Sequence, residues 1–336
     1  ARLKINVAAV PATPTGIIGD SVICPGQTYG FTIDPSGAFT THWTITDGLA
    51  TLTSQGQSLD YTFGATPPFQ ISAYNSDLQY PSCVSGSASI LLHTPADSQI
   101  EGPGDGCING LDDFSFPLIS GADYHWEVVP SSSGEVRRSD LNKVQIFWTQ
   151  SGPAMIRLTV CGTVIDKPVT IHPLPVFSLI GPPAACPGEL ITFQSDQPAM
   201  LHTWLDENEN LMGHADTIAI YPGTYALELQ DQFGCTDRKS FSIGTYPVPV
   251  VNLTTSDETF YCGAIPAGVT VTANTDGGGY TFEWFKDDIS QGIGGPIFNI
   301  TDFAMYDVEV TNSYGCKAKS PKVNFSACCP VTDCNG

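Results

Sequence analysis

Cysteine is the residue type in this 336-residue sequence whose number and spacing could do chemistry. Eight of the eleven cysteines form two sets, one before and one after a regularly spaced tryptophan. The first set is Cys24, Cys107, Cys186 and Cys262, and the second is Cys83, Cys161, Cys235 and Cys316. They stand outside the CxxC and HxxxH spacings of metal sites, so the arrangement favours disulfides formed in an oxidising compartment.

Three acidic segments could carry other chemistry: LDD at 111–113, DENEN at 206–210 and KDD at 286–288. Two carboxylates about 5 to 9 Å apart serve a glycosidase, and DENEN could offer oxygens to Ca²⁺. The segments occupy non-equivalent turns, and DENEN lacks the Asp-x-Asp-x-Asp-Gly spacing, so we favour solvated loops. Nucleophile-elbow, phosphate-loop, HExxH and dinucleotide motifs are missing. We expect no catalysis, metal or cofactor, with calcium at 206–210 as the open alternative.

The tryptophans that the cysteines flank define a repeat. Trp43, Trp126, Trp204 and Trp284 stand 83, 78 and 80 residues apart. Each has a cysteine 18 to 22 residues before it and another 31 to 40 after it. A fixed period shared by three positions indicates tandem domains. We divide the chain into repeat 1 (12–96), repeat 2 (97–173), repeat 3 (174–248) and repeat 4 (249–326), with 1–11 as the last strand of a preceding repeat and 327–336 as a linker or the start of another module.

Each repeat has the pattern of an all-β domain. Residues 174–248 contain short runs rich in β-branched and aromatic residues, separated by Gly, Pro, Asn and Asp turns. Six or seven such strands without a helical pattern predict a two-sheet antiparallel sandwich. The tryptophan belongs on the third strand, facing the core. Because side chains alternate along a strand, His42 and His125 should face solvent, whereas His202 should share the face of Trp204.

The net charge limits the classes of partner that the chain can bind. The formal charge is −21 with only 13 Lys plus Arg, which argues against nucleic acid, because phosphate binding needs clustered cations. No apolar run approaches the roughly 20 residues that cross a bilayer, and no signal segment opens the chain. We therefore expect a mature, soluble, exported piece with no membrane insertion.

Several phrases resemble a known family. ICPGQTYGFTI, THWTITDG, VQIFWTQSGPAMIRLTV and DQFGCTDRKSFSI are similar to the PKD-like and immunoglobulin-like repeats of large secreted Bacteroidetes surface proteins, including gliding and adhesion proteins. The GDG of PKD domains is replaced by TDG at 46–48. The resemblance implies four tandem immunoglobulin-like (PKD-like) sandwiches in an extended stalk, fibre or adhesin array at the cell surface. Its partners would be neighbouring repeats of the same long chain, surface polysaccharide or other cells.

A different class of function stays open, namely carbohydrate-binding accessory domains of a larger secreted enzyme. An exposed row of aromatic side chains would favour it. Tyr74 and Tyr80 in repeat 1 and Trp148 in repeat 2 are the candidates. For Trp148, packing at a strand edge is the favoured interpretation.

The resemblance also implies O-linked glycans on the pattern Asp, then Ser or Thr, then an apolar residue. DSV at Ser21 and DTI at Thr217 match this pattern. Asn252, Asn299 and Asn324 lie in Asn-x-Ser/Thr sequons, which would matter in a eukaryotic secretory route.

Two pairings of the repeated cysteines are open. Counting favours bonds within each repeat, closing loops of 49 to 59 residues. An immunoglobulin-like strand order instead places the two cysteines of one repeat at opposite ends, roughly 23 Å apart, beyond the 7 Å that a disulfide allows between α-carbons. Bonds between repeats would join Cys24 to Cys161, Cys107 to Cys235 and Cys186 to Cys316, leaving Cys83 and Cys262 to units beyond this segment. We narrowly favour this alternative; Cys328, Cys329 and Cys334 have no place in either.

Overall fold

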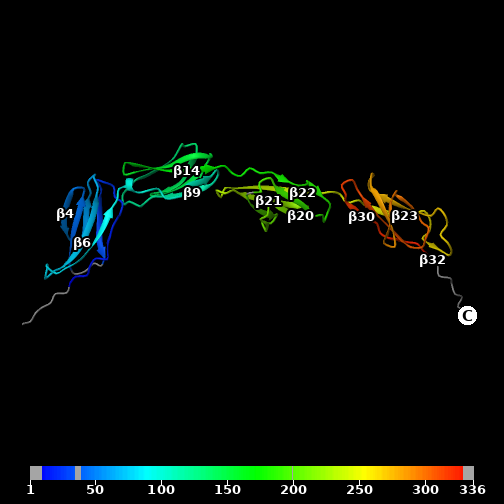
Figure 1. The fold of residues 1–336 in the computed structure, drawn as a ribbon, viewed down its shortest axis with the longest axis horizontal. Coiled ribbons are helices and arrows are strands. Elements are labelled where there is room, and N and C mark those ends of the chain that lie inside the picture. The colour runs from blue at the N-terminus through cyan, green and yellow to red at the C-terminus, as the bar shows by residue number, and fades with distance from the viewer. Residues whose placement is uncertain (1–9, 35–38, 199, 328–336) are drawn as a thin grey trace, which may run out of the picture. The chain divides into compact units, whose positions relative to one another are not determined.

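The computed structural model describes residues 10–34, 39–198 and 200–327, and in this part the chain is built of strands and turns (Figure 1). Its single helical element is the short 3₁₀ turn η1 (Pro95–Asp97). The predicted all-β class is confirmed. The final strand predicted at 1–11 and the linker predicted at 327–336 lie almost entirely outside the described residues.

Repeat 1 has two sheets around Trp43. Its strands are β1 (Gly16–Ile18), β2 (Thr28–Asp34), β3 (Phe39–Asp47), β4 (Ala50–Gln55), β5 (Ser58–Thr62), β6 (Phe69–Asp77) and β7 (Val84–Leu92). One sheet has the order β1-β2-β5 and the other β4-β3-β6-β7. Burial alternates along β3 and β6, because successive side chains point to opposite faces. The inward face of each strand therefore forms the core, and the outward face is left to solvent.

Repeat 2 has the same number of sheets but a different partition of strands. Its strands are β8 (Asp105–Cys107), β9 (Leu111–Ser115), β10 (Tyr124–Val129), β11 (Gly134–Asp140), β12 (Lys143–Trp148), β13 (Gly152–Val160) and β14 (Thr163–His172). The sheets have the orders β10-β13-β14-β8 and β11-β12-β9. The strand after the tryptophan strand, β11, therefore lies on the sheet opposite to Trp126.

Repeat 3 returns to the first arrangement. Its strands are β15 (Leu179–Ile180), β16 (Ala184–Ala185), β17 (Ile191–Ser195), β18 (Leu201–Asp206), β19 (Leu211–Gly213), β20 (Thr217–Ile220), β21 (Gly223–Gln230) and β22 (Thr236–Thr245). The sheets are β15-β17-β20 and β16-β22-β21-β18-β19. Here β19 pairs with the tryptophan strand β18.

Repeat 4 follows repeat 3 closely. Its strands are β23 (Val251–Thr255), β24 (Phe260–Tyr261), β25 (Thr270–Thr275), β26 (Thr281–Lys286), β27 (Ile289–Gly294), β28 (Ile297–Asn299), β29 (Met305–Thr311), β30 (Lys317–Lys319), β31 (Val323–Asn324) and β32 (Ser326–Ala327). The sheets are β23-β25-β28 and β27-β26-β29-β30, β31 pairs with β29, and β24 pairs with β32.

The position of the tight turn explains why repeat 2 differs. In repeats 1 and 4 residues with positive φ close the hairpin after the tryptophan strand: Gly48 (φ 61°) before β4, and Asp287 and Asp288 (φ 47° and 64°) before β27. In repeat 2 the tight turn comes one strand later, at Leu141 (φ 46°) between β11 and β12. Two-residue hairpins need positive φ and pair the strands they join, so β11 pairs with β12 and leaves the tryptophan strand.

A purely antiparallel arrangement was expected, and this is wrong in one detail. β8 pairs in parallel with β14, β16 with β22 and β24 with β32. Part of each opening segment leaves the three-stranded sheet and runs beside the last strand of its own repeat. Cys107 consequently lies opposite His172, at the end of β14. The first cysteine is thereby carried to the end of the repeat from which the chain leaves.

The four repeated tryptophans fill the cores. Trp43 is 0% exposed, Trp126 7%, Trp204 1% and Trp284 1%. Each indole N–H also donates to a backbone carbonyl that follows in the chain. The acceptors are Gly56 for Trp43, Leu141 for Trp126, Ala215 for Trp204 and Gly295 for Trp284, at 2.7 to 3.0 Å. A buried indole needs such a partner, so the tryptophan fixes the following segment as well as the core.

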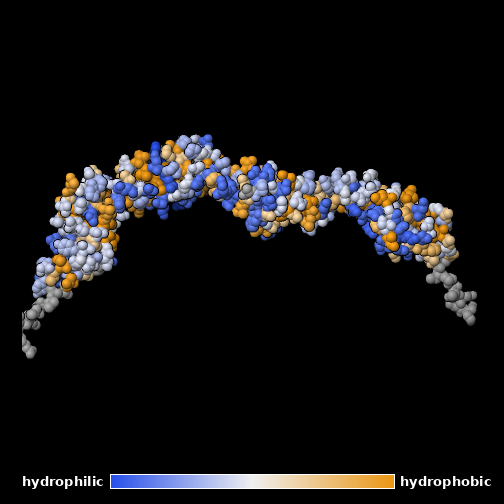
Figure 2. Space-filling view, viewed as in Figure 1, coloured by the Kyte–Doolittle hydropathy of each residue, from blue (hydrophilic) through white to orange (hydrophobic). Residues whose placement is uncertain are grey.

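The apolar cores group the repeats into two compact units. One unit comprises Ala1–Leu174 with Gln232–Cys235, and the other Pro175–Asp231 with Thr236–Gly336. A single cluster of buried residues runs through repeats 1 and 2, whereas repeats 3 and 4 each have their own cluster. On the visible surface of both units hydrophobic and hydrophilic residues are intermixed (Figure 2). In the described part of the chain no helix is long and apolar enough to span a membrane.

Candidate functional site

The first cysteines are set by a recurring turn. Cys24, Cys107 and Cys186 each accept, through their carbonyl oxygens, a hydrogen bond from the N–H three residues later. The third residue of each turn has positive φ: Gly26 at 85°, Asn109 at 64° and Gly188 at 77°. Glycine and asparagine are the residues that adopt this conformation most readily. The Cys-Pro-Gly phrase is therefore the sequence of a tight turn that presents the cysteine at the end of its repeat.

The second cysteines lie in the hairpin turns before the last strands, at the other end. Cys161, with φ 51°, connects β13 to β14 directly. Cys316 is held by Asn312, whose carboxamide oxygen accepts from the Cys316 and Tyr314 N–H groups at 3.0 Å. Cys235 belongs to the 232–235 turn, which groups with the first unit although it connects β21 to β22.

The two sets of cysteines bond to each other across consecutive repeats. Cys24 is bonded to Cys161, Cys107 to Cys235 and Cys186 to Cys316, with Cα–Cα distances of 5.5, 5.4 and 5.3 Å. These are the three pairs of the inter-repeat alternative. In the described residues none of the pairs within a repeat is formed. The first cysteine of one repeat thus meets the turn cysteine of the next.

Polar contacts surround the bond between Cys24 and Cys161. The Cys24 N–H donates to the Tyr29 hydroxyl at 2.7 Å. Asp20 accepts from the Ser120 N–H at 2.9 Å across 100 residues of sequence. In repeat 2 the Tyr124 hydroxyl accepts from the Ile119 N–H at 2.7 Å. Burial raises the pKa of both tyrosines, and the charge of Asp20 adds to the rise. The junction therefore holds both hydroxyls in the neutral form.

Stacked rings accompany the other two bonds. The His172 ring, at the end of β14, stacks on Phe233 with 3.6 Å between centroids, and its Nε2 lies 2.7 Å from Asp105 Oδ1. In the second unit Tyr246 stacks on Tyr314 with 4.3 Å between centroids. In both cases an aromatic residue at the end of a last strand, or directly after it, packs on the residue two positions before the turn cysteine. This pairing was missed in the sequence, although the phrases QFGC and SYGC carry it.

The remaining cysteines complete the account. Cys83 is a half-buried free thiol with no partner among the described residues, so its bond to a unit beyond this segment stays a prediction. Cys262 is disulfide-bonded within this chain, so the expectation that it reaches beyond the segment is wrong. The parallel pairing of β24 with β32 brings the end of the described chain beside it. Cys328, Cys329 and Cys334 lie outside the described residues.

The three aromatic candidates for sugar binding have different surroundings. Trp148 is 0% exposed and donates its indole N–H to Asp112 at 2.6 Å, so it is a core residue. Tyr80 is 37% exposed and isolated in a turn. Tyr74 is half-buried on β6 and its ring stacks on His42, with 4.8 Å between centroids and 8° between planes. Of the three candidates, only Tyr74 has surroundings that suit an aromatic side chain stacking on a sugar.

The acidic segments have different surroundings. LDD at 111–113 lies on strand β9 and not in the expected loop, and there Asp112 accepts from Trp148 and Asp113 from Gln145. DENEN at 206–210 holds a turn. Asp206 accepts from the Asn208 and Asn210 N–H groups at 2.8 Å and from the Asn210 carboxamide at 2.9 Å, and these bonds lower its pKa. Glu209 pairs with Arg238. No group of three or more His, Cys, Asp or Glu in the described ranges could hold a metal ion. Calcium at 206–210 stays a prediction.

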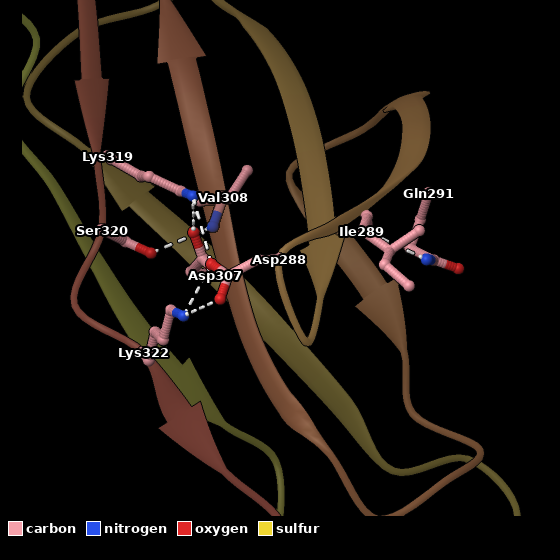
Figure 3. Close-up of polar contacts among 8 residues, drawn as sticks. All are labelled: Asp288, Ile289, Gln291, Asp307, Val308, Lys319, Ser320 and Lys322. Atoms are coloured by element: carbon pink, nitrogen blue, oxygen red, sulfur yellow. Dashed lines mark hydrogen bonds and ion pairs between the residues drawn. The ribbon is translucent and has the colours of Figure 1, made fainter.

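One buried carboxylate departs from this pattern. The Asp307 side chain on β29 is 1% exposed, and Lys319 Nζ lies 2.8 Å from its Oδ2. Apart from this contact its oxygens have no hydrogen-bond partner. Figure 3 shows Lys319, Lys322 and Asp288 gathered around it. Lys322 Nζ lies 2.6 and 2.7 Å from the oxygens of Asp288. The hydrogen bond to Asp307 raises the pKa of Lys319, which favours the charged form of the lysine.

The histidines and predicted glycan acceptors are placed as follows. His125 is exposed, His42 is half-buried on the outer side, and His202 is buried on the side of Trp204, with its Nδ1 bonded to the Met200 carbonyl at 2.8 Å. Ser21 and Thr217 are both exposed.

Comparison with solved structures finds chains of tandem immunoglobulin domains. The N-terminal four Ig domains of Dscam1 isoform 4.44 align with a TM-score of 0.25 and 12% identity, over 93% of this chain and 100% of that chain. Titin domains A168–A170 give 0.24 and 13%, over 68% and 97%. Murine CEACAM1b gives 0.24 and 14%, over 46% and 100%. No family profile and no curated protein matches the chain.

Scores of this size carry no argument by themselves. The strand orders and the tryptophan cores define the class, which is an all-β tandem array of immunoglobulin-like domains.

The tyrosine at the first junction predicts an alkaline sensitivity. Because the pKa of Tyr29 is raised in the folded state, its contribution to stability is fully present below the unfolded pKa of about 10. That contribution is lost as pH rises above this value and through the folded pKa. Tyr29→Phe should lower stability by about 1 kcal/mol at neutral pH, because the Cys24 N–H loses its acceptor. It should also lose less additional stability between pH 7 and about pH 10.5 than the wild type.

Urea unfolding followed by fluorescence at both pH values measures this effect, with the exposed Tyr80→Phe as control. Equal alkaline losses in the wild type and Tyr29→Phe would contradict the assignment.

The buried ion pair predicts a second difference. Lys319→Met should destabilise repeat 4 by roughly 1 to 3 kcal/mol, because Asp307 is left buried without its counter-charge. Lys317→Met on the same strand is the matched control. Its partner Glu309 lies 2.6 Å away in a solvent-exposed pair, and such pairs contribute about 0 to 1 kcal/mol. Hydrogen-exchange mass spectrometry of β29 peptides separates the two variants, and equal protection in both would contradict the role of Lys319.

Proposed function

We propose that this chain is a structural segment of a long extracellular surface protein, in which bonded immunoglobulin-like repeats form a rod-like stalk, fibre or adhesin array. The observation that carries the proposal is the pairing of the first cysteines of repeats 1, 2 and 3 with the turn cysteine of the next repeat. Disulfides persist in oxidising compartments outside the cytosol. A catalytic role is not part of the proposal, since carboxylates of all three acidic segments are engaged by other side chains: Asp112 by Trp148, Asp206 by Asn210 and Asp288 by Lys322.

The pairing changes the path that tension takes through the chain. From Cys24 to Cys316 the polypeptide runs 292 residues. The covalent shortcut crosses the bond to Cys161, follows 25 residues to Cys186 and crosses the bond to Cys316. At about 3.6 Å per residue, its maximum length is about 90 Å, against about 1,050 Å for the whole segment. Unfolding a sandwich therefore adds little length, which is the property of an inextensible tether.

Single-molecule stretching between the chain ends tests this function. Under oxidising conditions the segment between Cys24 and Cys316 should release at most 25 residues, and reductant should release the other 267. Cys161→Ser should lengthen the oxidised chain, because the shortcut from Cys24 is lost. Cys83→Ser is the matched control, since Cys83 has no bond in the described residues. Equal extension with and without reductant would contradict the tether.

Glycans on the array are a separate proposal that rests on the resemblance to Bacteroidetes repeats. Ser21 and Thr217 are exposed and follow an aspartate, so a modifying enzyme could reach both. Peptides containing Ser21 and Thr217 from the native organism should carry added hexose-scale mass, with the peptides of the three asparagine sequons as controls. Unmodified masses for both peptides would dispose of the O-linked pattern.

A further inference from the structure

The outer face of the β4-β3-β6-β7 sheet in repeat 1 lacks formal charge in its central rows. One cross-strand row consists of Gln55, His42, Tyr74 and Ser87, and the next of Thr53, Thr44, Ser72 and Ser89. All of these side chains are exposed or half-buried. With histidine neutral, none is charged, in a chain that has 34 acidic residues and a net charge of −21.

In each of the other repeats at least one of the two equivalent rows carries formal charges, whereas in repeat 1 neither does. In repeat 2 the row after the tryptophan contains Glu127, Arg157 and Asp166, which form ion pairs. In repeat 3 the row before the tryptophan contains Glu228 opposite Arg238. In repeat 4 Glu283 lies opposite Glu309, which lies opposite Lys319. Because the tryptophan strand and the two strands that follow it in these sheets pair in the same order in all four repeats, the fold does not require the uncharged rows of repeat 1.

The uncharged face also carries an aromatic pair and a hollow. The rings of His42 and Tyr74 are parallel, and each covers one face of the other. The stacked pair lies on the outer face of the sheet, beside the hydroxyl-bearing side chains. His42 is fixed by its Nε2, which lies 2.8 Å from the Ser76 hydroxyl. A hollow of about 410 Å³ lies beside the pair, lined in part by Thr44, Thr53 and Gln55. Ligand sites usually have volumes of about 300 to 1,000 Å³.

In Figure 2 the segment that Figure 1 colours blue bears mostly pale residues, of intermediate hydropathy. Hydroxyl and carboxamide groups both donate and accept hydrogen bonds, and aromatic rings supply rigid contact area. A ligand laid on charged rows would have to strip water from those charges, at a large cost. A neutral ligand rich in hydroxyl groups meets no such cost here.

From these observations we infer that the outer face of repeat 1 binds a neutral polysaccharide, with Tyr74 and His42 as the stacking platform and Thr44, Thr53 and Gln55 as hydrogen-bonding groups. An acidic polysaccharide is disfavoured by the charge of the chain. The site does not depend on the disulfide tether, so either proposal can fail without the other.

Native affinity electrophoresis of the full chain tests the site. The gels contain dextran, laminarin, galactomannan or xyloglucan as neutral probes, and alginate as an acidic probe. At least one neutral polysaccharide should retard the wild type, whereas alginate should not. Tyr74→Thr, which keeps a strand-forming residue, should weaken the retardation at least tenfold, whereas Tyr74→Phe should keep it. His125→Thr, at the position in repeat 2 equivalent to His42, is the matched control and should bind as the wild type does.

Circular dichroism establishes that each variant is folded. Three results would overturn the inference: no retardation by any of the four neutral polysaccharides, equal retardation of the wild type and Tyr74→Thr, or retardation by alginate alone. Dimerisation of the wild type that Tyr74→Thr abolishes, without retardation by a neutral probe, would assign the face to a second copy of the chain and would equally overturn it.

Discussion

A disulfide requires two α-carbons within about 7 Å, and the arrangement of the described repeats follows from meeting this requirement between neighbours. The first cysteine must reach the end of its repeat, which it does because its segment runs parallel to the last strand. The next repeat must offer a cysteine at its near end, which the hairpin before its own last strand does. A turn with positive φ then follows each of Cys24, Cys107 and Cys186. The sandwich fold and the turn together bring the two cysteines within the distance that the disulfide requires.

The class of fold could be predicted because its signals are local and repeated. The alternation of apolar residues, the four tryptophans and the Cys-Pro-Gly turns each report on a few neighbouring residues. The partition of strands in repeat 2 could not be predicted, because it depends on whether β11 pairs with the strand before it, β10, or with the strand after it, β12. The tight turn at Leu141, which has positive φ, joins β11 to β12. Leucine rarely adopts positive φ, so the sequence does not indicate this turn. The parallel pairing of β8 with β14 joins residues more than 60 positions apart and leaves no local pattern.

The candidate site was predictable to a similar degree. The cysteines stood out by spacing, and the opposite ends of one sandwich favoured bonds between repeats. The stacks of His172 on Phe233 and Tyr246 on Tyr314 were missed, because each joins two short phrases whose proximity only the fold establishes. The burial of Asp307 was missed for the same reason: an aspartate on an outward row normally faces solvent, but the Asp307 side chain is only 1% exposed. Tyr74 was singled out, but not its stack on His42.

The overlap of the three bonded loops has a consequence for damage to the backbone. The loops span residues 24–161, 107–235 and 186–316, so every peptide bond between Cys24 and Cys316 lies inside at least one of them. Exposed turns such as the one at Glu207 are where proteases cut. A single cut anywhere in this stretch leaves both pieces attached through a disulfide. In 107–161 and 186–235 two bonds hold the pieces together, so a protein outside the cell could be nicked and still not be severed.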